Sequence, residues 1–354
     1  MRMRAHWSIA PPAMAEVTRR YLEHTMVLET TMRTGSGVAT LTEAMSLDAD
    51  QHGHDLGSRA PRVLLRRIEC TQGEVELEME YAPRPEFGLI HPLLSWIDGG
   101  VAARGGGDML VLSTPSDPVI DGSMARLRFT LRAGEAAGFA LHHRSIEEEA
   151  PRAWAQEEIA EGIRGTIQAW RLWSSVHQRY EGPWSDLVYH SGRVLQSLMY
   201  QPTGAIVAAP TTSLPESEGG ERNWDYRYAW VRDASFTLDA LWVAACPDEA
   251  NKFFSWMTGT VASQIEGGSD LQIMFGIGGE HDLSERQLPH FSGWRDSRPV
   301  RVGNGAWNQR PHGIRRPGSV RHAVGAAPTP GEPGHSVEPV DHDREVRGHR
   351  PGHR

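Results

Sequence analysis

Cysteine is scarce in this chain of 354 residues, which contains only Cys70 and Cys246. Two thiols cannot build a disulfide framework or a thiolate zinc site within one chain. Their scarcity suits a reducing compartment, and we interpret the protein as cytoplasmic.

Long apolar runs and an excess of basic residues are also lacking. No run approaches the ~18 apolar residues of a membrane-spanning helix. The N-terminus reaches Pro11 and Pro12 without the apolar core of a signal peptide. The net charge of −9 argues against nucleic acid or an anionic membrane as a partner. We therefore expect neither nucleic-acid nor membrane binding.

Tryptophan is the abundant aromatic residue, with 12 copies against 8 phenylalanines. Its flat apolar face and single donor suit stacking on the C–H faces of sugars. Large helical barrels bury many tryptophans as well, so composition leaves both interpretations open.

Residues 1–145 have the pattern of a β domain. Residues 75–81 and 125–132 alternate apolar with charged side chains, the period of a half-buried strand. Glycine- and proline-rich turns separate them, as at 105–108 and 115–118. The pattern predicts an antiparallel β-sandwich whose charged side chains face solvent.

The period changes near residue 146 to apolar residues three or four apart, which predicts a linker helix over residues 146–182. A second helix is predicted from 185 to about 200, with Leu187 on its buried side. Helical patterns at 233–245 and 248–263 follow, separated by Pro247. The region 183–309 is thus predicted to be largely helical, with long loops of the kind that commonly carry function.

One of these loops is unusually rich in aromatic and charged residues. Residues 222–238 read RNWDYRYAWVRDASFTL. Asp233 falls at the start of a predicted helix, where it could simply cap that helix. Arg232 could likewise pair with any nearby carboxylate, so these residues alone do not require a binding site.

The same string resembles the signature of glycoside hydrolase family 15, which includes glucoamylases and a bacterial branch of trehalases. Residues 202–216, 271–277 and 297–304 resemble the bacterial branch too, and the resemblance covers roughly residues 6–309. It implies an N-terminal β-sandwich followed by an (α/α)6 barrel, of which residues 183–309 would form the first part. The implied substrate is an α-glucoside, either a maltooligosaccharide or trehalose, and no cofactor or metal is implied.

The resemblance also implies roles for four residues. The pair matching Arg232 and Asp233 hydrogen-bonds the 4- and 6-hydroxyls of the terminal glucose at the bottom of a pocket. The positions matching Tyr226 and Trp230 line the same subsite, where aromatic walls stabilise an oxocarbenium-like charge. Core packing is the alternative role for these two aromatic residues.

The two catalytic glutamates of the family have no counterpart in this chain. The family inverts the anomeric centre with an acid and a base about 6.5–9.5 Å apart, and the acid lies in a Trp-Glu motif. No such dipeptide occurs here, and Glu266, Glu280 and Glu285 match neither motif. We identify no catalytic residue and expect both glutamates downstream of residue 309.

Residues 310–354 are rich in Pro, Gly, His and Arg, a composition that predicts disorder. An out-of-frame reading of GC-rich DNA gives such a composition, so we hypothesise a frameshift near codon 310. A neighbouring frame without a barrel-like continuation would refute it. A metal-binding tract is the alternative, but the histidines are scattered among prolines without fixed spacing. The family's first sandwich strands are also absent before His6, so Met1 is interpreted as a late start.

The leading hypothesis is therefore an exo-acting, inverting hydrolase of α-glucosidic bonds, inactive in this truncated form. A non-catalytic carbohydrate-binding protein is the alternative, because the Arg232–Asp233 pair survives without its catalytic partners. Hydrolysis only after correction of the frame would favour the first, and sugar binding by the uncorrected chain would favour the second.

Overall fold

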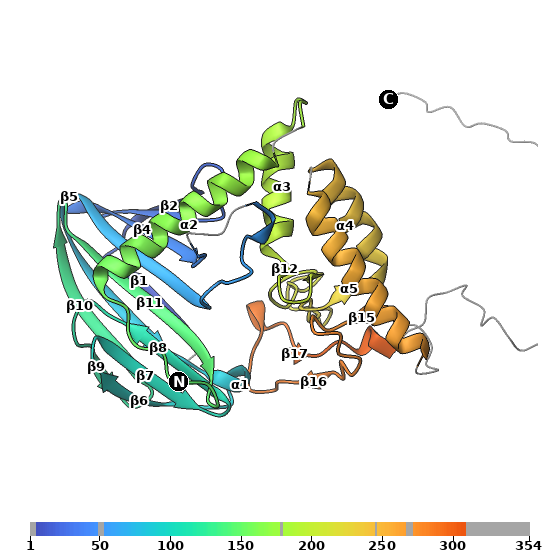
Figure 1. Ribbon diagram of the computed structural model, residues 1–354. Coiled ribbons are helices and arrows are strands. Elements are labelled where there is room, and N and C mark those ends of the chain that lie inside the picture. The colour runs from blue at the N-terminus through green and yellow to red at the C-terminus, as the bar shows by residue number, and fades with distance from the viewer. Residues whose placement is uncertain (1–4, 49–52, 178–179, 245, 267–271, 309–354) are drawn as a thin grey trace, which may run out of the picture. The chain divides into compact units, whose positions relative to one another are not determined.

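The computed structural model describes residues 5–48, 53–177, 180–244, 246–266 and 272–308 (Figure 1). They belong to one compact unit, Met1–Pro311. The second unit, His312–Arg354, lies outside the described residues, and so does the predicted disorder of the tail.

The first half of the chain folds into antiparallel strands, as the alternating pattern predicts. The strands are β1 (His6–Ala10), β2 (Glu16–Tyr21), β3 (Leu28–Arg33), β4 (Gly37–Met45), β5 (Val63–Ala82), β6 (Leu93–Ile97), β7 (Gly100–Gly105), β8 (Asp108–Ser113), β9 (Val119–Asp121), β10 (Met124–Arg132) and β11 (Ala136–Ser145). Two short helices lie between them, η1 (Gly53–Asp55) and α1 (Pro85–Gly88).

Strand β5, 20 residues long, belongs to two sheets. Its first half pairs with β4 and β11 in a sheet of order β2-β3-β4-β5-β11-β8-β7-β6, and its second half pairs with β1 and β10. One apolar core contains side chains of both sheets, such as Leu77 and Leu127 from one and Ile68 and Phe139 from the other. The two sheets form two layers around this core, and the prediction of an antiparallel sheet domain is confirmed.

The charged side chains of the two predicted strands face outward and pair across them. Arg126 contacts Glu80 at 2.7 Å and Arg132 contacts Glu74 at 2.9 Å. The apolar residues between them are buried, including Val75 at 0% exposure, except for Phe129, which is partly buried. The prediction of a solvated charged face is confirmed.

The linker helix α2 (Gln156–Val176) begins ten residues later than predicted. The prediction of helix from residue 146 was wrong because β11 continues to Ser145 and Pro151 follows in a non-helical segment. The helix starts where Glu158 accepts a hydrogen bond from the Ala155 amide at 2.8 Å, which satisfies one of the free N–H groups of the first turn.

Helix α2 joins the sheet to the helical part of the chain. Ile159 and Ile163 in its first half pack against Val63 and Leu65 of β5. Its second half contributes Trp173, which is 1% exposed, to a core shared with α3 (Ser185–Ser197), α4 (Val231–Val243) and α5 (Pro247–Glu266).

The three helices after α2 lie where the sequence predicts them, although Leu187 on α3 is 62% exposed and its predicted burial was wrong. Short strands and turns connect them and continue to residue 308: β12 (Met199–Tyr200), β13 (Ala205–Ile206), β14 (Ala229–Trp230), β15 (Met274–Phe275), β16 (Arg286–Gln287), η2 (Trp294–Asp296), β17 (Arg301–Val302) and η3 (Gly305–Asn308). The (α/α)6 barrel stays a prediction.

Across the described part of the chain, every helix is too short or too polar to cross a bilayer.

Candidate functional site

The aromatic loop is defined here as residues 207–230, between β13 and the end of β14. Its two arms run antiparallel and are tied by backbone hydrogen bonds. These are Ala208 N to Tyr228 O (3.0 Å), Ala209 N to Tyr226 O (3.0 Å), Ser213 N to Trp224 O (2.7 Å) and Glu216 N to Arg222 O (3.0 Å). The loop is therefore an ordered hairpin, which can hold side chains in fixed positions.

Asp225 fastens this hairpin to the segment near residue 303. Its carboxylate has no exposed surface and accepts bonds from Arg227 Nε at 2.9 Å, Arg227 Nη2 at 2.7 Å and the Gly303 amide at 3.1 Å. Asn304 Nδ2 donates to the Asp225 carbonyl at 3.1 Å. The hydrogen bond to Asp225 raises the pKa of Arg227 above its ordinary value. Sequence reasoning missed this role, because nothing in the sequence shows which distant segment Asp225 contacts.

The predicted sugar-binding pair lies in the first turn of α4. Arg232 Nε donates to Asp233 Oδ1 at 3.0 Å. The Arg232 guanidinium lies over the Trp230 ring, 5.6 Å from its centroid, a favourable cation–π distance. The structure therefore brings three of the four predicted residues together.

The position of this pair is fixed by a short strand pairing before the helix. Trp230 of β14 pairs with Met274 of β15, and the Val231 amide donates to the Ile273 carbonyl at 2.9 Å. Trp230 occupies the N-cap position without a side-chain capping bond, and Asp233 lies in the first turn of the helix. Its negative charge in the first turn still interacts favourably with the helix dipole.

The pair is open to solvent, since the side chain of Arg232 is 74% exposed and that of Asp233 is 45% exposed. The resemblance implies that it lies at the bottom of a pocket, which stays a prediction. Among the described side chains, Arg232 contacts the Asp233 carboxylate and the Trp230 ring.

Tyr226 is half-buried in the hairpin, four residues before Trp230, which is also half-buried. The Tyr226 amide donates to the Thr211 carbonyl at 3.3 Å. Its place on the hairpin is thus set by the backbone, and its predicted contact with sugar stays a prediction.

The three glutamates that match no catalytic motif lie in different settings. Glu285 forms an ion pair with Arg301 at 3.3 Å, and Glu280 accepts the Gly278 amide at 3.0 Å. The side chain of Glu266 lies outside the described residues. Glu285 thus holds a neighbouring chain segment, and Glu280 closes a local turn.

Among the described side chains, one group of three possible metal ligands occurs, and none of its members belongs to the aromatic loop.

Comparison with known proteins identifies the helical half of the chain. Residues 182–310 match the sequence profile of "Glycosyl hydrolases family 15". This range contains the aromatic loop, the Arg232–Asp233 pair and helices α3 to α5.

Curated relatives extend the similarity to the sheet domain. The trehalase of Mycolicibacterium smegmatis is 37% identical over 330 residues, covering 87% of this chain and 48% of the relative. The trehalase of Mycobacterium tuberculosis is 34% identical over 334 residues, with 88% and 48% covered. That of Thermoplasma acidophilum is 40% identical over 164 residues, covering 46% of this chain and 27% of the relative.

The chain therefore belongs to glycosyl hydrolases family 15, and the resemblance stated from its sequence is confirmed. Within that family it is a trehalase-like protein. It spans about half the length of the two mycobacterial trehalases, 48% of each.

Proposed function

We propose that this chain carries the sugar-binding half of an exo-acting, inverting hydrolase of α-glucosidic bonds, with α,α-trehalose as its substrate. The similarity to curated trehalases over 87–88% of the chain carries this proposal. A maltooligosaccharide is the second substrate candidate, because the Arg232–Asp233 pair would contact only the terminal glucose.

The chemistry of the pair supports recognition of a sugar end. A guanidinium and a carboxylate 3.0 Å apart offer donors and acceptors to adjacent hydroxyls, and bonds to charged groups are the stronger kind. A sugar that lacks those hydroxyls would leave the pair unsatisfied, which penalises the wrong substrate. Trp230 beside Arg232 would supply an apolar wall.

The proposal includes the domain limits expected from the sequence. They are a sheet domain over 1–145, a linker over 146–182, the first part of an (α/α)6 barrel over 183–309 and a tail over 310–354. Two helices expose apolar side chains on their outer surfaces. Further helices would cover these side chains in a complete barrel. These are Phe236 at 72%, Trp242 at 62% and Val243 at 58% on α4, and Phe254 at 51% on α5.

Such helices would also convert the open pair into a pocket floor and would bring the two catalytic glutamates. Without them the chain is expected to bind sugar weakly and to hydrolyse none. The two buried free thiols, Cys70 and Cys246, support action in the reducing cytoplasm.

The test compares this chain with a version translated in the neighbouring frame after codon 309. We expect trehalose hydrolysis, measured as glucose release, only in the frame-changed version. Maltose is assayed in parallel to separate the two substrate candidates. Hydrolysis of neither sugar by a folded frame-changed protein would refute the proposal.

A binding assay on the uncorrected chain addresses the alternative of a non-catalytic carbohydrate-binding protein. Asp233→Asn should weaken trehalose binding about 10- to 100-fold, because a charged hydrogen bond is lost. Asp239→Asn is the control, since Asp239 is exposed on the same helix. If the uncorrected chain binds trehalose tightly and both variants retain that binding, the proposed role of the Arg232–Asp233 pair in sugar binding is contradicted.

A further inference from the structure

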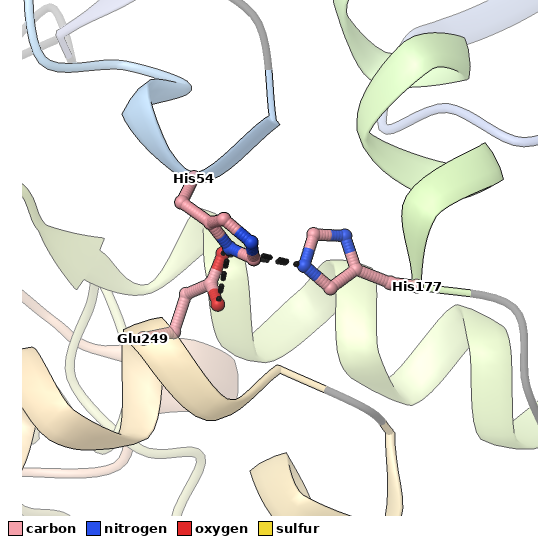
Figure 2. A group of neighbouring side chains, drawn as sticks. All are labelled: His54, His177 and Glu249. Carbon is pink, nitrogen blue, oxygen red and sulfur yellow. Dashed lines mark hydrogen bonds and ion pairs between the residues drawn. The ribbon is translucent and has the colours of Figure 1, made fainter.

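Three segments far apart in sequence meet at one cluster of side chains (Figure 2). His54 comes from η1 beside the sheet domain, His177 ends helix α2, and Glu249 lies in the first turn of α5. The side chain of His177 is 3% exposed and that of Glu249 is 0% exposed, while His54 is 34% exposed. We call this group the His-His-Glu cluster.

The potential ligand atoms of the cluster are spaced as metal ligands are. His54 Nδ1 lies 3.2 Å from Glu249 Oε2 and 3.3 Å from His177 Nε2. His177 Nε2 lies 3.7 Å from Glu249 Oε1. Bonds of about 2.0–2.1 Å in a tetrahedral zinc site place neighbouring ligand atoms roughly 3.3–3.4 Å apart. The observed separations bracket that spacing without rearrangement.

Each ligand is also held from behind, as metal ligands usually are. The other ring nitrogen of His54, Nε2, lies 3.1 Å from the Asp248 carboxylate. The other nitrogen of His177, Nδ1, lies 2.7 Å from the Trp173 carbonyl. Trp173 Nε1 donates to Glu249 Oε1 at 3.0 Å. The outer bond of His177 requires N–H at Nδ1, so the lone pair of a neutral ring is on Nε2 and points into the cluster.

The cluster needs a positive charge at its centre. A carboxylate with no exposed surface is costly unless a cation compensates it. The nearby Lys252 ammonium contacts the His54 carbonyl at 2.9 Å. A metal ion bound between the three ligands would supply the compensating charge.

We propose that His54, His177 and Glu249 bind a divalent transition-metal ion, with zinc as the preferred ion. Two imidazoles and one carboxylate are a ligand set that zinc uses with a water in the fourth position. The partly exposed His54 leaves that position accessible. The ion would fasten the sheet domain, the linker helix and α5 to one another, a role separate from the aromatic loop.

The sequence prediction of no metal site relied on spacing. His177 is 123 residues from His54, and Glu249 is 195 residues from His54. Ligands this far apart form no sequence motif, so only the fold reveals their proximity.

The test measures zinc bound per chain by elemental analysis after dialysis, together with thermal unfolding with Zn²⁺ or with EDTA. We expect wild type to bind one zinc more than His54→Ala or Glu249→Gln. Excess Zn²⁺ should raise the Tm of wild type by roughly 5 °C and leave that of both variants unchanged. Glu249→Gln keeps an amide oxygen for Trp173, so it separates loss of the ligand from loss of packing.

His143→Ala is the matched control, because the His143 side chain is exposed and contacts the Asp108 carboxylate at 2.8 Å, away from the cluster. It should retain the zinc of wild type. Histidines in residues 310–354 would bind zinc equally in every variant, so the difference between proteins isolates the cluster. Equal zinc content in wild type and Glu249→Gln, or an unchanged wild-type Tm in Zn²⁺, would overturn the proposal.

Discussion

The carboxylate of Asp225 is fully buried, yet its partner Arg227 is 38% exposed. The two residues are only two positions apart, and the same carboxylate also holds the amide of Gly303. A substitution here therefore affects both the hairpin and the segment that supports it.

We expect Asp225→Asn to lower the free energy of unfolding by about 2–3 kcal/mol, because it leaves buried donors without a charged acceptor. Urea denaturation measures this loss. The control is Arg222→Ala. The side chains of Arg222 and its partner Glu216 are 76% and 58% exposed, and an ion pair this exposed contributes less than about 1 kcal/mol. Equal losses in the two variants would contradict the anchoring role of Asp225.

His142 is a second buried polar residue, 2% exposed, whose ring packs edge-on against Trp154 at 5.1 Å. Burial, and then the charges of Arg144 and Arg152, lower the pKa of His142 to about 4. The folded state therefore prefers the neutral ring, while the unfolded state takes up a proton near pH 6.5. This residue stabilises the fold fully above pH 6.5, and the stabilisation is lost as the pH falls toward 4.

We expect wild type to lose on the order of 2–3 kcal/mol of stability through this group between pH 7 and pH 4. His142→Leu should lack this pH-dependent loss, so its free energy of unfolding relative to that of wild type should rise as the pH falls. Urea midpoints at both pH values provide the measurement. A constant difference between the two proteins across this range would show that His142 does not titrate as described.

Helix α2 illustrates how a single element depends on contacts at its beginning. The Gln156 side chain accepts the Gly138 amide at 2.7 Å and donates to the Gly138 carbonyl at 3.0 Å. A Cβ at Gly138 would lie 2.9 Å from Ile159. The glycine thus permits close approach of the helix, and the glutamine completes both backbone bonds of β11.

We expect Gln156→Ala to cost about 1–3 kcal/mol, because two backbone groups of Gly138 lose their partner. Gln168→Ala, an exposed glutamine on the same helix, should change stability by less than about 0.5 kcal/mol. Thermal and urea unfolding of both variants test the difference. Equal behaviour would mean that water replaces the Gln156 side chain without cost.

Elements with one strong period were predictable from the sequence. Residues 75–81 form a strand because alternate side chains enter one core, and Pro247 begins α5 because proline suits a first helical turn. The start of α2 was missed because residues 146–155 have a helical composition but follow a strand that ends at Ser145. Leu187 was misplaced because an apolar stripe does not identify which neighbours are present.

The candidate site was predictable only in part, for a related reason. The string around Arg232 identifies the family, since its residue types are specific. The anchor of Asp225 on Gly303 and the His-His-Glu cluster depend on contacts between distant segments. Local pattern contains no information about such contacts.

At the scale of the whole molecule, the unit Met1–Pro311 has its own apolar cores. We expect a chain that ends at Pro311 to unfold with the same free energy as the full chain, within about 0.5 kcal/mol, because the tail composition offers little apolar surface to bury. Urea denaturation of both lengths measures this. A clear loss of stability in the shorter chain would show that the tail contributes to folding.

Strand β5 has a consequence for how the sheet domain comes apart. Gly73, at φ +64, lies where the strand passes from one layer to the other, and a Cβ there would meet the Ser36 carbonyl at 2.1 Å. One continuous backbone thus supplies an inner strand to each layer. Neither layer can lose its central ladder while the other stays intact, so the two should open together in a single transition.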